Sequence, residues 1–201
     1  MNGSTDGMDT GLLERGWRLQ YIDGDQGMTT FYLIRHGESR LDLAAAGNLK
    51  GAERGWSAHI IPLTEKGISQ IENASKFLSN EDPQIVISSP MSRALQSAAI
   101  LSRILNLPLR VEFDLHEWIC GWRDSMTLVE ETEAEMRELG GEWPIGETRD
   151  WEPMSSVRGR VGRVLERYRT FQRVVVVCHE MVIFSLTGKR MGFAEFVKLK
   201  K

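Results

Sequence analysis

Four short apolar runs constrain the fold of this chain more than any other feature of its sequence. They are Phe31–Ile34, Ile85–Ile87, Leu109–Phe113 and Val174–Val177, and each has the length of a strand. The segments between them are longer, and several carry apolar residues at helical spacing. Strands that alternate with helices predict an α/β fold with a mostly parallel central sheet. We therefore expect a three-layer α/β/α architecture with helices on both faces of the sheet.

Capping residues indicate where the helices begin and end. Thr64, Ser89 and either Ser155 or Ser156 are expected to cap three helix N-termini, because their hydroxyls can accept bonds from the first backbone N–H groups. Gly188 is expected to end a short helix, since glycine adopts the left-handed conformation without strain. The predicted helices span residues 64–78, 90–106, 127–139, 156–168 and 181–187.

The length of 201 residues suits one large domain. We expect an N-terminal extension over residues 1–27 and one domain over residues 28–201. Within the extension, Trp17–Ile22 alternates as a strand does and is predicted to pair antiparallel with residues 29–34. Residues 194–199 also alternate and predict a last strand at an edge of the sheet.

Composition excludes several classes of function. The net charge is −3 and no basic block is present, so the electrostatic pattern of a nucleic-acid-binding protein is missing. No apolar run approaches the length that spans a bilayer. Two cysteines are too few for a disulfide framework, and Cys178 is expected to pack as a small apolar residue. We therefore expect a cytoplasmic protein that binds neither nucleic acid nor a membrane.

Reactive or cationic side chains follow each predicted strand. Arg35 and His36 come directly after the first strand, and Glu117 and His179 follow the last two. Arg93 stands in the first turn of the helix after the second strand, where a cation opposes the helix dipole unless an anion binds there. Because the carboxyl ends of parallel strands meet at one edge of a sheet, these side chains are predicted to converge.

Five motifs extend this pattern in order along the chain. They are Arg35-His36-Gly37-Glu38-Ser39, Pro62-Leu63-Thr64-Glu65-Lys66-Gly67, Ser88-Ser89-Pro90 through Arg93-Ala94-Leu95-Gln96-Ser97-Ala98, Leu115-His116-Glu117, and Val176-Val177-Cys178-His179. A chain with these motifs resembles the phosphoglycerate mutase-like branch of the histidine phosphatase superfamily. The resemblance implies a phosphoglycerate mutase-like fold. It also implies a phosphatase that acts on a small phosphorylated substrate and needs no metal or other cofactor.

The resemblance implies a role for each of five catalytic residues. His36 would attack phosphorus and carry a transient phosphohistidine, while Arg35, Arg93 and His179 would hold the phosphoryl oxygens. Glu117 would protonate the leaving oxygen and then take a proton from water. General chemistry agrees with these roles, because guanidinium groups match the charge that a phosphoryl transition state spreads over its equatorial oxygens.

Two of these groups need pKa values that suit their roles. The surrounding cations are expected to keep the His36 imidazole unprotonated, and so nucleophilic, near neutral pH. Shielding by neighbours such as Trp118 is expected to raise the pKa of Glu117 toward the working pH, so that one carboxyl group can serve as acid and then as base.

Substrate binding is assigned to Arg35, Ser39, Asp42, Arg93, His179 and Glu180. Two of these positions depart from the family pattern. Asp42 stands where the family usually has asparagine, and Glu180 stands where glycine commonly follows the second histidine. Each departure brings a potential negative charge close to a site for an anion. Glu180 also stands at a helix N-terminus, where a carboxylate is favourable, and is expected to point outward.

Three functions fit these residues. The favoured one is a phosphomonoester hydrolase. The second is a phosphoglycerate mutase, which is disfavoured because the stretch between Glu117 and His179 is short for enclosing a phosphoglycerate. The third is a catalytically weak relative that binds a phosphorylated ligand or a protein partner, for which Asp42 and Glu180 are the only support.

Specificity elements are expected in residues 40–59 and 118–151, where Arg40, Trp56, Trp122 and Arg123 are candidates for contact with the leaving group. His59 is interpreted as a surface residue and His116 as a structural one. The glutamates of residues 127–139 are interpreted as a solvated helix face and not as a metal site. The sequence leaves the identity of the substrate and the oligomeric state open.

Overall fold

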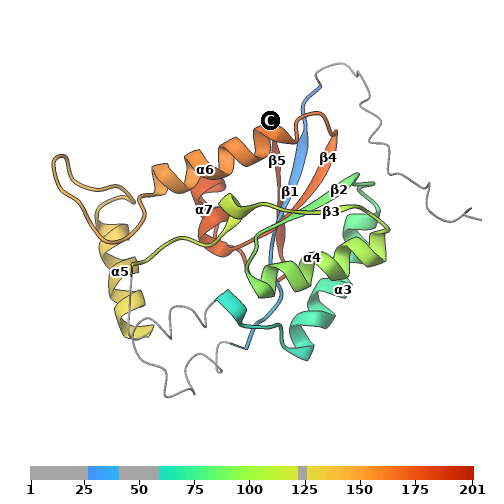
Figure 1. Ribbon diagram of the computed structural model, residues 1–201, viewed down its shortest axis with the longest axis horizontal. Helices are drawn as coiled ribbons and strands as arrows, with labels where there is room; N and C mark the ends of the chain where they lie inside the picture. The colour runs from blue at the N-terminus through green and yellow to red at the C-terminus, as the bar shows by residue number, and fades with distance from the viewer. Residues whose placement is uncertain (1–26, 41–58, 122–125) are drawn as a thin grey trace, which may run out of the picture.

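The computed structural model describes residues 27–40, 59–121 and 126–201. At its centre lies a five-stranded sheet with the strand order β3-β2-β4-β1-β5 (Figure 1). All neighbouring strands pair in parallel except β5, which pairs antiparallel with β1. The strands are β1 (Thr30–Arg35), β2 (Ile85–Ser88), β3 (Leu109–Val111), β4 (Arg173–Cys178) and β5 (Phe196–Lys200).

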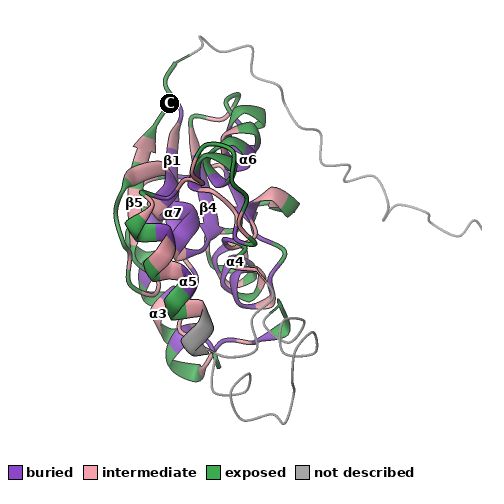
Figure 2. Ribbon diagram, turned by 90° about the vertical axis from the view of Figure 1, so that its left-hand side faces the viewer, coloured by how far each residue is buried: buried purple, intermediate pink, exposed green. Residues whose placement is uncertain are grey.

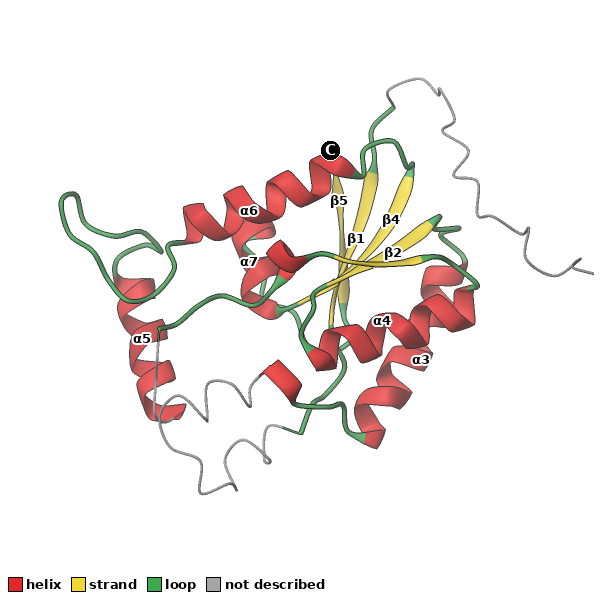
Figure 3. Ribbon diagram, viewed as in Figure 1, coloured by secondary structure: helices red, strands yellow, loops and turns green. Residues whose placement is uncertain are grey.

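Helices cover both faces of this sheet, which confirms the predicted three-layer α/β/α fold (Figures 1 and 3). One face packs against α6 (Met154–Arg167) and α7 (Glu180–Thr187), and the other packs against α3 (Glu65–Ser79) and α4 (Ser92–Leu105). The buried residues form a continuous layer between helices and strands in Figure 2. The sheet is therefore enclosed from both sides, as the apolar strand sequences require.

The four valines of β4 show why this strand takes the middle of the sheet. Val174 and Val176 face the α6 and α7 side, whereas Val175 and Val177 face α3 and α4, because successive side chains alternate across a strand. All four are fully buried. Each buried valine contributes about 1.5–3 kcal/mol relative to an exposed one, so a strand of valines is stable only between two helical layers. Cys178 ends the strand fully buried, as predicted.

The helix α5 (Met126–Glu138) lies beyond the end of the sheet (Figure 1), and its Met136 belongs to the same buried cluster as Trp118 and Trp151. The Trp151 ring lies 6.4 Å from the rings of both Trp118 and Trp143. Trp118 directly follows Glu117, so this cluster supports the segment that carries the predicted acid. No helix within the described ranges has the length and apolar character needed to cross a membrane.

The predicted third core strand, Leu109–Phe113, is wrong in two respects. Its pairing ends at Val111, and residues 113–115 form the short 3₁₀ helix η1 (Phe113–Leu115). It is also an edge strand, in which Val111 and Phe113 remain exposed, because β2 is its only neighbour in the sheet. The predicted edge strand at residues 194–199 is confirmed as β5.

The predicted pairing of residues 17–22 with residues 29–34 is also wrong. β4 pairs with one side of β1 and β5 with the other, so no edge of β1 is left for a third strand. Residues 17–22 themselves lie outside the described residues.

Helix starts were predicted with mixed success. Thr64 caps α3 as predicted and accepts a bond from Gly67 N at 2.9 Å. However, α4 begins at Ser92 and α6 at Met154, with Met91 and Pro153 as their N-caps.

Candidate active site

The loop after β1 is fixed by a close contact between two backbones. His36 N–H donates to the Cys178 carbonyl at 3.1 Å, so the pairing of β1 with β4 continues one residue beyond the strand. A β-carbon on Gly37 would stand 2.3 Å from the carbonyl oxygen of Gly67, at the start of α3. Only glycine allows this approach. The packing therefore fixes the backbone that carries His36.

The imidazole of His36 is held by a hydrogen bond at each ring nitrogen. Its Nδ1 lies 2.7 Å from the Gly37 carbonyl, which can only accept, so Nδ1 carries the hydrogen and donates. Its Nε2 accepts from Arg93 Nε at 3.0 Å. Burial, followed by the charge of Arg93, lowers the pKa of His36 to about 3. The ring is therefore neutral at physiological pH, as expected from the sequence, and its Nε2 carries no proton, so its lone pair can attack phosphorus once Arg93 Nε donates to a phosphoryl oxygen instead.

Arg93 occupies the first turn of α4 and is almost completely buried. Burial lowers its pKa, and the neighbouring charge of Arg35 acts in the same direction, while Glu117 opposes the shift. A buried guanidinium group and a partly buried one, which repel one another beside a neutral histidine, form a pocket that favours an anion. The structure thus brings Arg35, His36 and Arg93 together, as the convergence of strand ends predicts.

His179 stands at the N-cap of α7 with its ring fully buried, and its centroid lies 5.2 Å from that of His36. Its Nε2 lies 2.7 Å from Ser89 Oγ, and Ser89 Oγ also accepts the Met91 N–H at 3.3 Å. Ser89 was expected to cap the helix as its N-cap, but its hydroxyl orients His179 instead. Burial lowers the pKa of His179 well below its ordinary value. In the tautomer in which Nε2 accepts from the Ser89 hydroxyl, the hydrogen of this neutral ring is on Nδ1.

Three buried polar atoms have no hydrogen-bond partner among the described residues: Arg35 Nε, His179 Nδ1 and Ser39 Oγ. Buried polar groups without a partner are rare in folded proteins and need an explanation. Two of the three are donors beside His36, where a phosphoryl oxygen would satisfy them. The third, Ser39, was predicted as a substrate-binding residue from its motif.

Glu117 reaches the site from the segment after η1. Its Oε1 accepts the Trp118 N–H at 2.8 Å. Burial raises the pKa of Glu117, and the charges of Arg93 and Arg35 only partly oppose this shift. The direction agrees with the sequence-based expectation of an acid tuned toward working pH. Glu117 also influences the pKa of Arg93, which shows that the two groups lie within electrostatic reach.

Arg160 is a residue of the site region that the sequence analysis missed. It is buried on α6, where its Nη1 donates to the carbonyls of Asp114 at 2.5 Å and His116 at 2.8 Å, and its Nη2 donates to that of Glu117 at 3.3 Å. Glu152 pairs with the same guanidinium at 2.8 and 3.0 Å. The signal in the sequence is an arginine beside the apolar stripe of a helix, where charge is costly unless it is paired.

The expectation that Glu180 points outward is wrong. Its Oε2 lies 2.6 Å from Arg35 Nη1 and its Oε1 lies 2.8 Å from Arg190 Nη1. The guanidinium of Arg35 attracts the carboxylate more strongly than water does, because both groups are partly desolvated. Arg35 also donates from Nη1 to the Met191 carbonyl at 2.7 Å and lies 4.3 Å from the centroid of the Phe193 ring.

The remaining predicted site residues fall into two groups. Asp42, Trp56, Trp122 and Arg123 lie outside the described residues. His59 is exposed, as expected, and His116 is half-buried with its Nδ1 2.8 Å from the Glu117 carbonyl. Within the described ranges, no group of three or more His, Cys, Asp or Glu side chains is arranged to hold a metal ion.

A family comparison accounts for this arrangement. Residues 31–195 match the model of the histidine phosphatase superfamily (branch 1). The chain belongs to this superfamily. Its named relatives are phosphatases, and the protein is accordingly a metal-independent histidine phosphatase.

Named relatives are phosphatases too. The chain is 26% identical over 167 residues to the adenosylcobalamin/alpha-ribazole phosphatase of Escherichia coli strain K12, covering 80% of this chain and 78% of the relative. It is 27% identical over 165 residues to an uncharacterized phosphatase, PhoE, of Bacillus subtilis strain 168, covering 82% and 79%. A solved mycobacterial glucosyl-3-phosphoglycerate phosphatase shares the fold, with a TM-score of 0.65 at 20% identity over 87% of this chain and 91% of that one.

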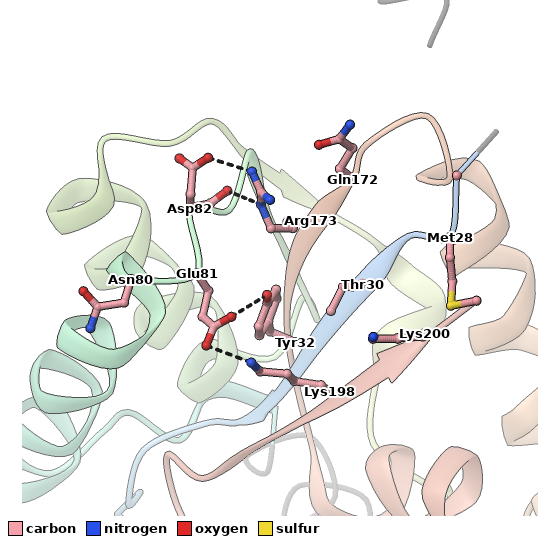
Figure 4. A pocket seen from close by; sticks show the side chains of 11 residues that line it. Met28, Thr30, Tyr32, Asn80, Glu81, Asp82, Gln172, Arg173, Lys198 and Lys200 are labelled. Atoms are coloured by element: carbon pink, nitrogen blue, oxygen red, sulfur yellow. Dashed lines mark hydrogen bonds and ion pairs between the residues drawn. The ribbon is translucent and has the colours of Figure 1, made fainter. Parts of the chain in front are cut away.

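A cavity of about 570 Å³ lies at the opposite end of the sheet from the histidine phosphatase site (Figure 4). It is lined at the starts of β1 and β4 and the end of β5. Its carboxylates are already paired: Asp82 binds Arg173 at 2.7 Å, and Glu81 accepts from Lys198 at 2.8 Å and from the Tyr32 hydroxyl at 2.9 Å. These contacts tie the strand ends to the turn after α3.

Proposed function

We propose that this histidine phosphatase hydrolyses a small phosphomonoester through a phosphohistidine formed on His36. The observation that carries the proposal is the state of the His36 ring. Its Nδ1 is bound to the Gly37 carbonyl, and its Nε2 lone pair lies beside Arg93 in a neutral, buried imidazole. A nucleophile needs this combination of a fixed orientation and an unprotonated nitrogen.

In the first step, His36 Nε2 attacks phosphorus while the bond from phosphorus to the leaving oxygen breaks. Arg35 Nε and His179 Nδ1, which have no partner among the described residues, would bind the equatorial oxygens together with Arg93. Glu117, whose pKa is raised by burial, would give its proton to the leaving oxygen. The alcohol then departs uncharged.

In the second step, water attacks the phosphohistidine. The Glu117 carboxylate takes a proton from this water, the bond from phosphorus to Nε2 breaks, and inorganic phosphate is released. The proton balance closes, because Glu117 regains the proton that it lost and His36 returns to its neutral form. One carboxyl group serves both steps because its pKa lies nearer to the working pH than that of an exposed glutamate.

The substrates named for the relatives are not assigned to this protein. Their printed names include an alpha-ribazole phosphatase and a glucosyl-3-phosphoglycerate phosphatase, so the family fold accommodates different alcohols. Hydrolysis is favoured over a mutase reaction because the named relatives are phosphatases. We also propose residues 28–201 as the catalytic domain, residues 1–27 as an extension, and the cytoplasm as the compartment. The family match over residues 31–195 and two cysteines that form no disulfide support these assignments.

The test combines turnover with trapping. Hydrolysis of p-nitrophenyl phosphate should proceed at full rate with a chelator present and should be abolished in His36→Ala. Rapid denaturation during turnover should trap phosphate on the wild-type protein in an acid-labile, alkali-stable form, as expected for phosphohistidine. The matched control is His59→Ala, which removes an exposed histidine and should leave both readouts unchanged. Turnover that survives in His36→Ala, or phosphate trapped on another residue, would refute the proposal.

A further inference from the structure

A chain of alternating charges connects α5 to the phosphoryl pocket. Glu133 on α5 binds Arg190, Arg190 binds Glu180 at 2.8 Å, and Glu180 binds Arg35 at 2.6 Å. The Arg35 Nη1 atom that meets Glu180 also donates to the Met191 carbonyl. This atom is therefore fully occupied by the protein itself. The arginine would meet the substrate through its other N–H groups.

Burial indicates which wall of the pocket a substrate passes. His36, Arg93 and His179 are 4%, 8% and 0% exposed, so they enclose the phosphoryl group itself. The side chains of Arg35 and Glu180 are 20% and 22% exposed, so they form the part of the wall that opens toward solvent. The alcohol attached to phosphorus would extend toward this more exposed side, where the Glu180 carboxylate lies 2.6 Å from Arg35.

The field of Glu180 reaches the place where the leaving oxygen would lie. Burial is the main cause of the raised pKa of Glu117, the group that would protonate that oxygen, and the charge of Glu180 adds to it against the opposing charges of Arg93 and Arg35. A carboxylate that opposes the ionisation of Glu117 also opposes any second negative charge on the departing alcohol. A neutral or cationic alcohol meets no such opposition.

We propose that Glu180 is a specificity-determining residue that selects phosphomonoesters with an uncharged or cationic alcohol over those with a second anionic group. The inference rests on the proposed function and narrows its substrate class. Proteins often discriminate between two substrates by placing an unfavourable charge close to the one that they reject.

The test uses two substrates of nearly the same shape. Glycerol 3-phosphate has a hydroxymethyl group where 3-phosphoglycerate has a carboxylate. The ratio of their kcat/KM values is measured in the wild type and in Glu180→Gln, which keeps the size of the side chain. The same pair is measured as competitive inhibitors of p-nitrophenyl phosphate hydrolysis, so that a ratio of inhibition constants is obtained as well. The wild type should prefer glycerol 3-phosphate, and Glu180→Gln should reduce this preference roughly tenfold. The change should shrink at high salt.

Glu81→Gln provides a matched control. It removes one carboxylate that is also paired with a cation, but at the far end of the sheet (Figure 4), and should leave both ratios unchanged. Thermal melts establish that both variants are folded. Ratios that stay the same in Glu180→Gln, or that change equally in Glu81→Gln, overturn the inference. The proposed function has its own readout, the loss of p-nitrophenyl phosphate hydrolysis in His36→Ala, so the two can fail separately.

Discussion

Replacing Arg160 with lysine tests how Glu117, the proposed general acid, is positioned. Arg160 makes three bonds to the carbonyls of residues 114, 116 and 117, and two to Glu152. Lysine keeps the positive charge beside Glu152, but a single ammonium group cannot reproduce a planar fork with five donors. At least one buried carbonyl then loses its partner, which costs about 1–3 kcal/mol. The melting temperature should fall by roughly 2–4 °C for each of these kcal/mol.

The effect on activity should depend on the leaving group. General acid catalysis contributes about 10²–10⁴-fold when the leaving oxygen is strongly basic. Arg160→Lys loosens the segment that carries Glu117 but keeps its carboxyl group. We therefore expect kcat/KM for an alkyl phosphate to fall roughly tenfold, which is less than the full contribution of general acid catalysis. The loss should vanish for 2,4-dinitrophenyl phosphate, because its leaving group departs without a proton.

The assay is kcat/KM for a series of aryl and alkyl phosphates with the wild type, Arg160→Lys and Glu117→Gln. This parameter reports the first phosphoryl transfer and is insensitive to the hydrolysis of the intermediate that follows. Both variants should depend more steeply on leaving-group basicity than the wild type does. An equal loss for every substrate would refute the reasoning, because it would mean that Arg160 supports the fold but does not position the acid.

Three further predictions concern the same pocket. Ser89→Ala should lower the free energy of unfolding, measured with urea, by about 1–3 kcal/mol, because His179 Nε2 loses its partner. It should also lower kcat, measured at steady state, more than the control Ser92→Ala does. Gly37→Ala should yield little folded protein by circular dichroism, because its β-carbon would lie 2.3 Å from the Gly67 carbonyl oxygen. Glu117→Gln should raise the melting temperature at pH 8 but not at pH 4. The folded-state pKa of Glu117 lies above its ordinary value of 4.5, so ionisation of this carboxyl group destabilises the folded state as the pH rises, and glutamine removes that cost. A gain that is equal at both pH values would contradict this reasoning.

Strand positions were accessible from the sequence because burial on both faces demands a distinctive composition. Val174–Val177 and Phe31–Ile34 have few ways to hide their side chains other than inside a parallel sheet. The convergence of Arg35, His36, Arg93 and His179 follows from the same geometry, since each comes directly after a strand or begins the next helix.

Contacts between charged groups were not accessible in the same way. Arg160 donates to the backbone carbonyl of Glu117 and pairs with Glu152, and Glu180 pairs with Arg35 and Arg190. Periodicity indicates which face of a helix is buried but not which distant carbonyl or guanidinium lies opposite. Ser89 shows the same limit, because a hydroxyl before a helix serves equally well as a cap or as a partner for a ring nitrogen.

The strand order has a consequence for how the protein is made. β1 leads into His36 and is synthesised before both of its neighbours among the described strands, β4 and β5. Thr29 and Lys201 close this pairing with two backbone bonds of 2.7 and 3.0 Å. Contacts so distant in sequence form slowly. A nascent chain that stops before residue 173 therefore leaves β1 without either neighbour, and phosphatase activity should arise only when β4 and β5 have docked.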